Sequence, residues 1–345
     1  MTKEAPASYW TFFAGEAIRG HSPLYERLAL GIGDDAQLRA MAARVKPGQP
    51  QANIILAAVH YLLLEGTDHP LADHYASVRP GATVVGDPMP LFRDFCLTHE
   101  ARLARLIETR VTNTNEVARS TSLYPAFDFV AREVGAPLHL IEIGPSAGFN
   151  LNWDRYHYTY RAGTGAQTRG PASASLKLEA EVRSTRLLDL GRKFPQVESR
   201  VGLELNPVNV DSPEDRLWLK ALIWPELKHR LVRLEMAIAT ARAHPHKIVA
   251  GDALANLGPV ATATPRDGVL VVYHSHVTYQ FSEEMRERLT RTLETLSRER
   301  PVYRISIEWD GGQYPVVVGR YDNGRSTKRT VALCDPHGAW IEWTA

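Results

Sequence analysis

Hydrophobic residues in the first part of the chain recur at the spacing of helices. Ser22-Pro23 is a typical helix start, with a capping side chain followed by proline at the first helical position. Only Thr83-Val84-Val85 suggests a strand here. The helical runs cover residues 24–32, 54–65, 90–109 and 116–134. We therefore predict an α-helical domain over residues 1–135, which would cap the rest of the chain.

The pattern changes at residue 138, where short continuous apolar runs replace the helical spacing. Such runs are typical of parallel strands buried on both faces. They cover residues 138–143, 200–205, 246–250, 268–273 and 302–307. Helical patterns lie between them, and two of these begin at the capping serines Ser212 and Ser282. Strands that alternate with helices predict a doubly wound α/β domain with a mostly parallel sheet, over residues 136–345.

Two segments of this second domain depart from the alternation. Residues 316–318, 330–333 and 340–343 form strand patterns without intervening helices, and Asp322-Asn323-Gly324 resembles a hairpin turn. We therefore expect antiparallel strands at the end of the sheet. Residues 152–195 contain two alternating stretches and are predicted to form an inserted hairpin.

Composition narrows the classes of partner. Forty basic residues stand against 39 acidic ones, for a net charge of +1, so no global basic field exists to attract nucleic acid. The two cysteines, Cys96 and Cys334, are too few for a disulfide scaffold or a CxxC zinc site. No HExxH pattern is present, and we expect no metal.

Targeting signals are also missing from the sequence. The first residues, Met-Thr-Lys-Glu-Ala-Pro, carry an acid and no apolar core, unlike a signal peptide. The longest apolar run, Ile54 to Leu64, includes His60 and is too short to cross a bilayer. We expect a cytoplasmic protein with a small-molecule substrate and no membrane partner.

The central motif is the glycine-rich turn that follows the strand at 138–143: Glu142-Ile143-Gly144-Pro145-Ser146-Ala147-Gly148-Phe149-Asn150. Small residues let the backbone approach a ligand closely, and a helix beginning here would favour an anionic group. A tight turn without any ligand is the simplest alternative. A nicotinamide-binding turn requires Gly or Ala where Phe149 stands, so this motif matches it poorly.

A hydrolase is a second interpretation, since Gly144-Pro145-Ser146-Ala147-Gly148 has the form G-x-S-x-G. The nucleophile Ser146 would need an acid and then a histidine downstream. Asp310 or Asp322, followed by His337, preserves that order. However, the region upstream is helical and offers neither the earlier strands nor the oxyanion loop of such an enzyme, so we favour this interpretation less.

The third interpretation is the S-adenosylmethionine site of a class I methyltransferase. Its first loop has an acid followed by small residues, and the matching positions are Glu142, Gly144, Ser146, Gly148 and Asn150. An acid at the end of the second strand would bind the ribose hydroxyls, and Glu204 stands there. A further acid after the third strand would accept from the adenine amino group; Asp252, beside Ala253, has that position. This order of positions favours S-adenosylmethionine, or its product S-adenosylhomocysteine, as the cofactor.

The chain as a whole resembles an uncharacterised bacterial family catalogued as domain of unknown function 2332. The resemblance covers nearly the whole chain and is strongest at 115–119, 142–151, 206–207, 218–219, 224–226 and 251–252. It implies a Rossmann-like class I methyltransferase fold preceded by a helical domain, and it brings no established activity.

Catalytic candidates follow the strand at 268–273. His274 and His276 titrate near neutral pH, and either imidazole could act as a general base for a methyl acceptor. We favour His274 because it lies nearer the strand. The alternative is that one histidine caps the loop and the other is solvated.

Substrate candidates come from three places. Asn115, Glu116 and Arg119 stand at positions i, i+1 and i+4 of an expected helix. Glu116 and Arg119 can pair on one helical face, either structurally or as part of a lid over the cofactor. Tyr156 could stack on a flat substrate or pack within the hairpin. Asp310 follows the strand at 302–307 and could line the same cleft.

These patterns favour methyl transfer from S-adenosylmethionine to a small molecule. A non-catalytic nucleotide binder of the same fold and the serine hydrolase remain as alternatives.

Overall fold

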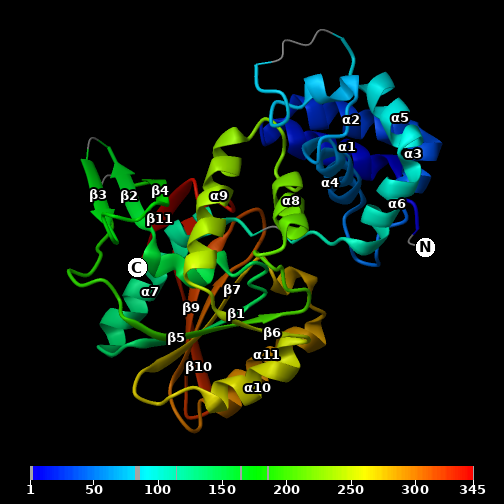
Figure 1. Ribbon diagram of the computed structural model, residues 1–345. Coiled ribbons are helices and arrows are strands. Elements are labelled where there is room, and N and C mark those ends of the chain that lie inside the picture. The colour runs from blue at the N-terminus through cyan, green and yellow to red at the C-terminus, as the bar shows by residue number, and fades with distance from the viewer. Residues whose placement is uncertain (1–2, 82–85, 114, 164, 185, 345) are drawn as a thin grey trace. The chain divides into compact units, whose positions relative to one another are not determined.

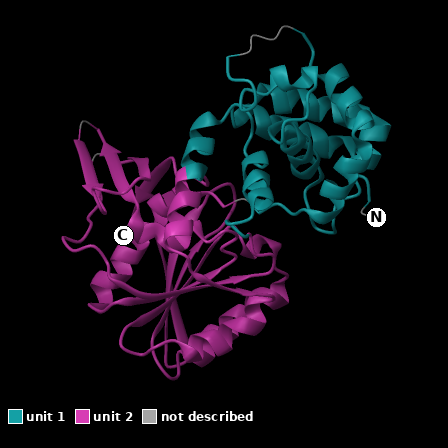
Figure 2. Ribbon diagram, viewed as in Figure 1, with its two compact units in different colours: residues 1–114, 209–235 teal, residues 115–208, 236–345 magenta. Residues whose placement is uncertain are grey.

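A computed structural model describes residues 3–81, 86–113, 115–163, 165–184 and 186–344. The chain folds into two compact units (Figure 2). Unit 1 comprises residues 1–114 and 209–235, and unit 2 comprises residues 115–208 and 236–345. This division differs from the predicted boundary at residue 135. The helix before that boundary lies in unit 2, and a segment from the predicted second domain lies in unit 1.

Unit 1 is a helical bundle around one almost fully buried helix, α4 (Gln51–Leu64). The capping role predicted for Ser22 is confirmed, since its hydroxyl accepts from the backbone N–H of Tyr25. The predicted run over 90–109 is two helices, which meet at His99. The remaining elements are α1 (Ala7–Arg19), α2 (Pro23–Asp34), α3 (Ala36–Ala42), η1 (Pro70–His74), α5 (Met89–Thr98), α6 (Glu100–Thr109) and α8 (Pro213–Ala221). The strand suggested at residues 83–85 lies outside the described residues.

Residues 209–235 join unit 1 because α8 packs on α4. The ring of His60 contacts the carbonyl oxygen of Ala221 through Nδ1 at 3.0 Å. Trp218 donates its indole N–H to the carbonyl of Val111 at 2.9 Å, and Arg110 pairs with Asp215. These contacts join positions far apart in the sequence, so hydrophobic periodicity alone does not reveal them.

The described residues of unit 2 form one eleven-stranded sheet, in the order β3-β2-β4-β11-β10-β9-β8-β7-β1-β5-β6 (Figure 1). Strands β6, β5, β1, β7 and β8 are parallel neighbours, and β9 and β10 continue the sheet in antiparallel fashion. The mixed α/β architecture with a large, mostly parallel sheet is therefore confirmed. The strands are β1 (Leu138–Ile143), β2 (His157–Ala162), β3 (Gly165–Arg169), β4 (Lys177–Val182), β5 (Val197–Glu204), β6 (Lys247–Ala250), β7 (Val269–Ser275), β8 (Val302–Ile307), β9 (Pro315–Asp322), β10 (Arg325–Cys334) and β11 (Trp340–Trp343).

Successive side chains of a strand point to opposite faces of the sheet. Since β1 and β7 are buried at every position, both faces of the parallel strands are covered, and helices provide this cover. Ile141 and Val272 belong to the core under α10 (Ala253–Ala263) and α11 (Glu283–Leu296). The neighbouring positions Glu142 and Tyr273 face the other side, where Phe127 of α7 (Ser120–Val134) packs edge-on against Tyr273. The remaining helical elements are η2 (Val117–Arg119), η3 (Phe149–Arg155), η4 (Thr278–Gln280) and α9 (Lys228–Ala243), which crosses the boundary between the units.

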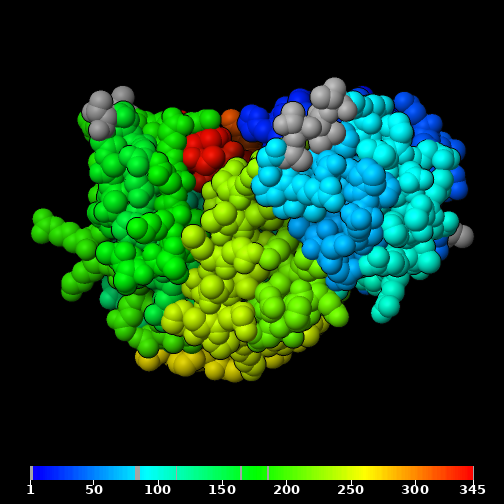
Figure 3. Space-filling model, turned by 45° about the horizontal axis from the view of Figure 1, so that its top comes forward, coloured from blue at the N-terminus to red at the C-terminus, as the bar shows by residue number. Residues whose placement is uncertain are grey.

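The predicted insertion at 152–195 contains three strands. The two alternating stretches expected to pair as a hairpin are β2 and β4, and this expectation is wrong, because they pair parallel to each other. An additional strand between them, β3, forms the antiparallel hairpin with β2, and β4 joins β11 of the main sheet. Strand β3 lies at the edge, and this segment is the green surface in Figure 3. Among all the residues that the structure describes, in both units, no helix is long and apolar enough to cross a membrane.

A proline inside α7 explains one contact of this insertion. Pro125 has no backbone N–H, so it cannot donate to the carbonyl of Thr121 one turn earlier. The hydroxyl of Tyr160 on β2 donates to that carbonyl instead, at 2.7 Å. The inserted strand therefore satisfies a backbone group that the helix leaves open.

Candidate functional site

The turn after β1 has a backbone that favours small residues. Gly144 and Gly148 have φ values of 70° and 76°, and Ser146 lies between them at 54°. At Gly144 an added Cβ would lie 2.6 Å from Cγ2 of Val277, so only glycine fits this close approach between two loops. Ser146 is strained, because a side chain at positive φ is uncommon and such residues concentrate at functional sites.

Asn115 and Glu204 hold this turn from two sides. Asn115 donates from Nδ2 to the carbonyl of Pro145 at 2.8 Å and accepts from the N–H of Phe149 at 3.2 Å. Glu204 accepts from the N–H of Ser146 at 2.7 Å through Oε2. The predicted substrate residue Asn115 and the predicted ribose ligand Glu204 therefore both lie at the glycine turn.

The segment that follows the turn differs from the helix considered above. The structure has η3, a 3-10 helix of seven residues, and its N-cap residue is Gly148, which has no side chain to cap the helix. Asn150 of η3 accepts from the hydroxyl of Ser120 at 2.8 Å. Its Nδ2 is buried and makes no hydrogen bond within the described part of the chain. The turn therefore offers backbone proximity rather than a long helix dipole.

Glu142 is buried beneath the turn, with 2% of its surface exposed. Its Oε2 lies 3.0 Å from the hydroxyl of Tyr273 on β7. Burial raises the pKa of Glu142 to about 8, and the nearby charge of Glu204 adds to the rise, while Tyr273 and Arg119 oppose it. Glu142 is therefore mostly protonated at neutral pH and does not serve as a fixed anion.

His274 is fully buried between two charged side chains. Its Nδ1 lies 2.6 Å from Oε1 of Glu308, which can only accept, so Nδ1 carries the proton. Its Nε2 then accepts from Arg304, whose Nη2 lies at 2.9 Å. Burial and the charge of Arg304 lower the pKa of His274. This arrangement leaves His274 no lone pair for a substrate, and we drop our preference for it as the base.

Glu308 is the residue that organises this loop. Besides His274, its Oε1 accepts from the backbone N–H groups of Val277 and Thr278 at 3.0 and 3.1 Å. Burial opposes ionisation, but these donors prevail and lower the pKa of Glu308 to about 2. An ionised Glu308 therefore fixes the loop after β7, the loop that contacts Gly144.

His276 has a different environment from His274. It has a φ of 55°, and its ring stacks on Tyr314 with centroids 4.9 Å apart. Its Nε2 is buried and makes no hydrogen bond within the described residues. Burial, with the charge of Arg119, lowers the pKa of His276 to about 3. His276 is therefore a neutral imidazole, and its buried Nε2 has no hydrogen-bond partner among the described residues.

We expected Glu116 and Arg119 to lie in a regular α-helix, but Arg119 belongs to the short 3-10 segment η2 that precedes α7, and Glu116 is the N-cap residue of that segment. Glu116 caps the short η2 by accepting from the N–H of Ala118 at 3.1 Å. Arg119 donates from Nε to the carbonyl of Pro336 at 3.0 Å. Since the charge of Arg119 acts on both Glu142 and His276, it lies among the candidate residues at the ends of β1 and β7.

Asp252 and Ala253 lie at the end of the neighbouring strand β6. The carboxylate of Asp252 caps α10 by accepting from the N–H of Leu254 at 2.8 Å, and Ala253 is the first residue of that helix. The N–H of Gly251 donates to the carbonyl of Glu204 at 2.9 Å. The two predicted cofactor acids therefore lie on adjacent strand ends.

Two other predicted substrate residues have different surroundings. Tyr156 has no exposed surface, and its hydroxyl donates to the carbonyl of Phe149 at 2.6 Å. We therefore leave Tyr156 out of the candidate site, because a substrate cannot stack on a buried ring. Asp310 is exposed in a turn, where its backbone pairs with that of Gln313.

The acids and the histidine considered as partners of a nucleophilic Ser146 lie at opposite ends of the strands. Tyr321, next to Asp322, pairs with Val302 at the start of β8. Asp322 therefore lies at the amino ends of the parallel strands, whereas the turn after β1 lies at their carboxyl ends. This is too far away for Asp322 to act as the acid of a triad with Ser146. Asp310 and His337 follow strands that end at the same edge as β1.

Sequence reasoning missed Arg304 and Tyr273 as members of the site. Arg304 is the one charged residue of β8, and a charged residue in a buried strand usually has a specific partner. That signal could have identified it. Tyr273 offered no comparable signal, because aromatic residues are common in buried strands.

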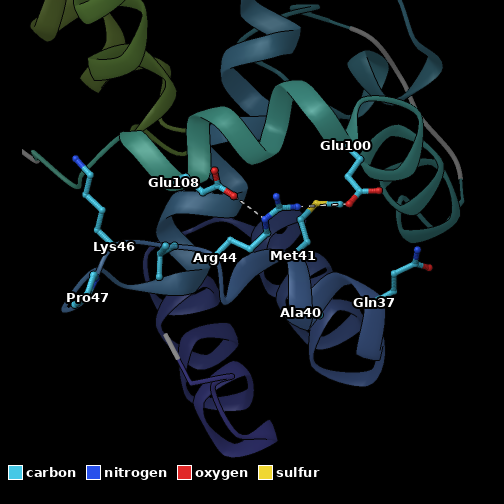
Figure 4. A pocket seen from close by; sticks show the side chains of 9 residues that line it. Gln37, Ala40, Met41, Arg44, Lys46, Pro47, Glu100 and Glu108 are labelled. Carbon is cyan, nitrogen blue, oxygen red and sulfur yellow. Dashed lines mark hydrogen bonds and ion pairs between the residues drawn. The ribbon is translucent and has the colours of Figure 1, made fainter. Parts of the chain in front are cut away.

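A separate groove lies in unit 1 (Figure 4). Its volume is about 820 Å³. Arg44 extends across it to Glu108, with Nε and Oε1 2.8 Å apart, and to Glu100 at 3.5 Å. Because the acids neutralise the guanidinium, we place no ligand here. Among the residues that the structure describes, no group of three or more His, Cys, Asp or Glu side chains could hold a metal ion.

A family model described as an uncharacterized protein conserved in bacteria, DUF2332, matches residues 8–343. The chain belongs to this family. The match includes parts of both units, and it confirms the family resemblance noted from the motifs. No curated protein and no solved structure matches the DUF2332 chain.

Proposed function

We propose that unit 2 binds S-adenosylmethionine and transfers its methyl group to a small molecule. One observation carries the proposal: the glycine turn, Glu204 and Asp252 follow three adjacent parallel strands, β1, β5 and β6. The order β6-β5-β1-β7-β8 corresponds to the 3-2-1-4-5 order of Rossmann-like sheets. In such sheets ligands bind at the carboxyl ends of the strands, where the strand order reverses, and that point here is β1.

The residues at these strand ends fit the cofactor's polar groups. Each carboxylate oxygen of Glu204 accepts one backbone N–H, and each can accept a second hydrogen bond, as a pair of ribose hydroxyls requires. Asp252 is exposed and could accept from an adenine amino group. The bound cofactor would supply an electrophilic methyl group on a sulfonium.

His276 is the residue that we assign to the methyl acceptor. A hydroxyl or amine acceptor must lose its proton. Nε2 of His276, which has no partner among the described residues, would accept a hydrogen bond from that group in the tautomer that carries its proton on Nδ1. A pKa of about 3 makes this imidazole a weak base, so its role is to orient the acceptor. His274 and Glu308 act as positioning residues for the loop that carries it.

Thermal unfolding with added nucleotides tests the proposal. A ligand that binds the folded chain raises the unfolding temperature, and S-adenosylhomocysteine should do so while NAD does not. Homocysteine-coupled detection with a panel of small nucleophiles then tests turnover. Binding without turnover of any acceptor would favour the non-catalytic binder. Stabilisation by NAD alone would contradict the cofactor assignment.

A serine hydrolase is the second candidate, and the strained Ser146 favours it. A nucleophile elbow places its serine on a sharp, strained turn after a strand, and Ser146 has φ 54° in a G-x-S-x-G turn after β1. A fluorophosphonate probe that labels Ser146, with the label lost in Ser146→Ala, would support the hydrolase. The methyltransferase proposal expects no label at Ser146.

A further inference from the structure

A serine, a histidine and an aspartate meet at the opposite end of β1. His139 is the second residue of β1, and Ser199 on β5 is its register partner. Nδ1 of His139 lies 2.7 Å from Oγ of Ser199, and Nε2 lies 2.9 Å from Oδ1 of Asp267, just before β7. Because the glycine turn follows the other end of β1, this cluster is separate from the site proposed above.

The hydrogen bonds fix the tautomer of His139. The carboxylate of Asp267 can only accept, so Nε2 of His139 carries the proton. The lone pair of Nδ1 then faces the hydroxyl of Ser199, which donates to it. His274 has the same kind of carboxylate partner, but Arg304 occupies its lone pair. In His139 the lone pair is directed at a potential nucleophile.

Burial and close packing hold the imidazole in place. His139 is 1% exposed, whereas Ser199 is partly exposed and the side chain of Asp267 is 73% exposed. Gly268 lies against the ring, and an added Cβ there would come within 3.0 Å of Cδ2 and Nε2 of His139. The imidazole is therefore buried, while the two residues that it contacts are partly or largely exposed.

We propose that Ser199, His139 and Asp267 form a nucleophilic site that cleaves small acyl esters. A nucleophile bonded to a base that a third group orients is the general signature of covalent catalysis. Oγ of Ser199 attacks the acyl carbon while its proton moves to Nδ1 of His139. Nδ1 returns the proton to the departing alkoxide as the ester C–O bond breaks. In the second step Nδ1 takes a proton from a water molecule as the water oxygen bonds to the acyl carbon. Nδ1 then returns that proton to Oγ of Ser199 as the bond between Oγ and the acyl carbon breaks and the acid leaves.

The exposure of Asp267 determines how much this residue is expected to accelerate the reaction of Ser199. It orients His139 and stabilises the imidazolium that forms, as the acid of a serine protease triad does. Solvent screens an exposed carboxylate, so its contribution is smaller than that of a buried one. We expect its removal to slow the reaction of Ser199 by about tenfold or more.

A fluorophosphonate probe tests the proposal on the full chain. Ser199 displaces fluoride, forming an O–P bond as the P–F bond breaks, and the hydroxyl proton passes through His139 to solvent. Peptide mass spectrometry should locate the adduct on Ser199. Asp267→Asn should slow labelling by about tenfold or more, while the exposed control Asp189→Asn should leave the rate unchanged.

Hydrolysis of p-nitrophenyl acetate gives an independent readout. Release of p-nitrophenolate above background should disappear in Ser199→Ala and persist in Ser184→Ala, an exposed serine outside the cluster. Absence of an adduct on Ser199 in correctly folded protein would overturn the proposal. Equal labelling rates in Asp267→Asn and the parent chain would overturn it as well.

Discussion

The carboxyl group of Glu142 and the hydroxyl of Tyr273 lie 3.0 Å apart on neighbouring strands, beneath the glycine turn. The contact connects β1 and β7 at the end where the candidate site lies. It also places a titratable group in a buried environment, and burial raises the pKa of Glu142 to about 8.

The first prediction follows from that pKa. Between pH 4.5 and 8 the unfolded chain has lost the Glu142 proton and the folded chain keeps it, so this residue makes stability fall as pH rises. Glu142→Gln should remove that fall. The difference in the free energy of unfolding between the variant and the parent chain should therefore be more favourable to the variant at pH 8 than at pH 5, by on the order of 2–4 kcal/mol. Urea unfolding at both pH values measures it. The exposed Glu198→Gln on β5 should show no such change; an unaltered pH profile in Glu142→Gln would refute the assignment.

The second prediction concerns the fit of Gly144. Gly144→Ala combines a positive φ with a Cβ 2.6 Å from Val277, and should cost about 2–4 kcal/mol. Gly311→Ala has a φ of 55° but no atom within 4 Å, so it should cost only about 1 kcal/mol. Adding Val277→Ala to Gly144→Ala should recover part of the difference. Equal costs for the two glycine variants would mean that the loops do not pack as described.

The third prediction tests Pro125 and Tyr160. Tyr160→Phe leaves the carbonyl of Thr121 without a donor and should cost about 1–3 kcal/mol. Pro125→Ala restores a helical N–H to that carbonyl, so the double variant should lose less than the sum of the single losses. Tyr158 donates to Trp153 instead, and Tyr158→Phe should gain nothing from Pro125→Ala. A purely additive cycle for Tyr160→Phe would contradict this account.

The fourth prediction concerns His274. The guanidinium of Arg304 lowers the pKa of His274, so Arg304→Gln should raise it. Titration of the histidine ring signals by NMR measures the change. Burial and the charge of Arg119 are the main causes that lower the pKa of His276, so Arg304→Gln should change its titration less than that of His274. A constant His274 pKa in Arg304→Gln would show that its lone pair is not held as described.

The strands of unit 2 were predictable because buried parallel strands are continuous apolar runs. Strands β1 and β8 begin and end at the predicted residues, and Ser212 caps its helix as expected. The hairpin turn is also confirmed, with Asn323 and Gly324 both at positive φ. These signals are local, so the sequence contains them.

The boundary of unit 1 and the part played by His274 were not predictable in the same way. The docking of α8 depends on contacts such as that between His60 and Ala221, far apart along the chain. His274 and His276 look equivalent in the sequence, and only the position of Arg304 distinguishes them. Tertiary contacts decide both outcomes, and no local pattern records them.

Calorimetric titration of the full chain with S-adenosylhomocysteine tests the central proposal most directly. We expect one binding site per chain and no response to NAD. Glu204→Gln should weaken binding by about 10- to 100-fold, since charged hydrogen bonds to the ribose are worth about 1–3 kcal/mol, while Glu198→Gln on the same strand should leave the affinity unchanged. Absence of binding heat with S-adenosylhomocysteine, or an affinity that Glu204→Gln does not alter, would contradict the account.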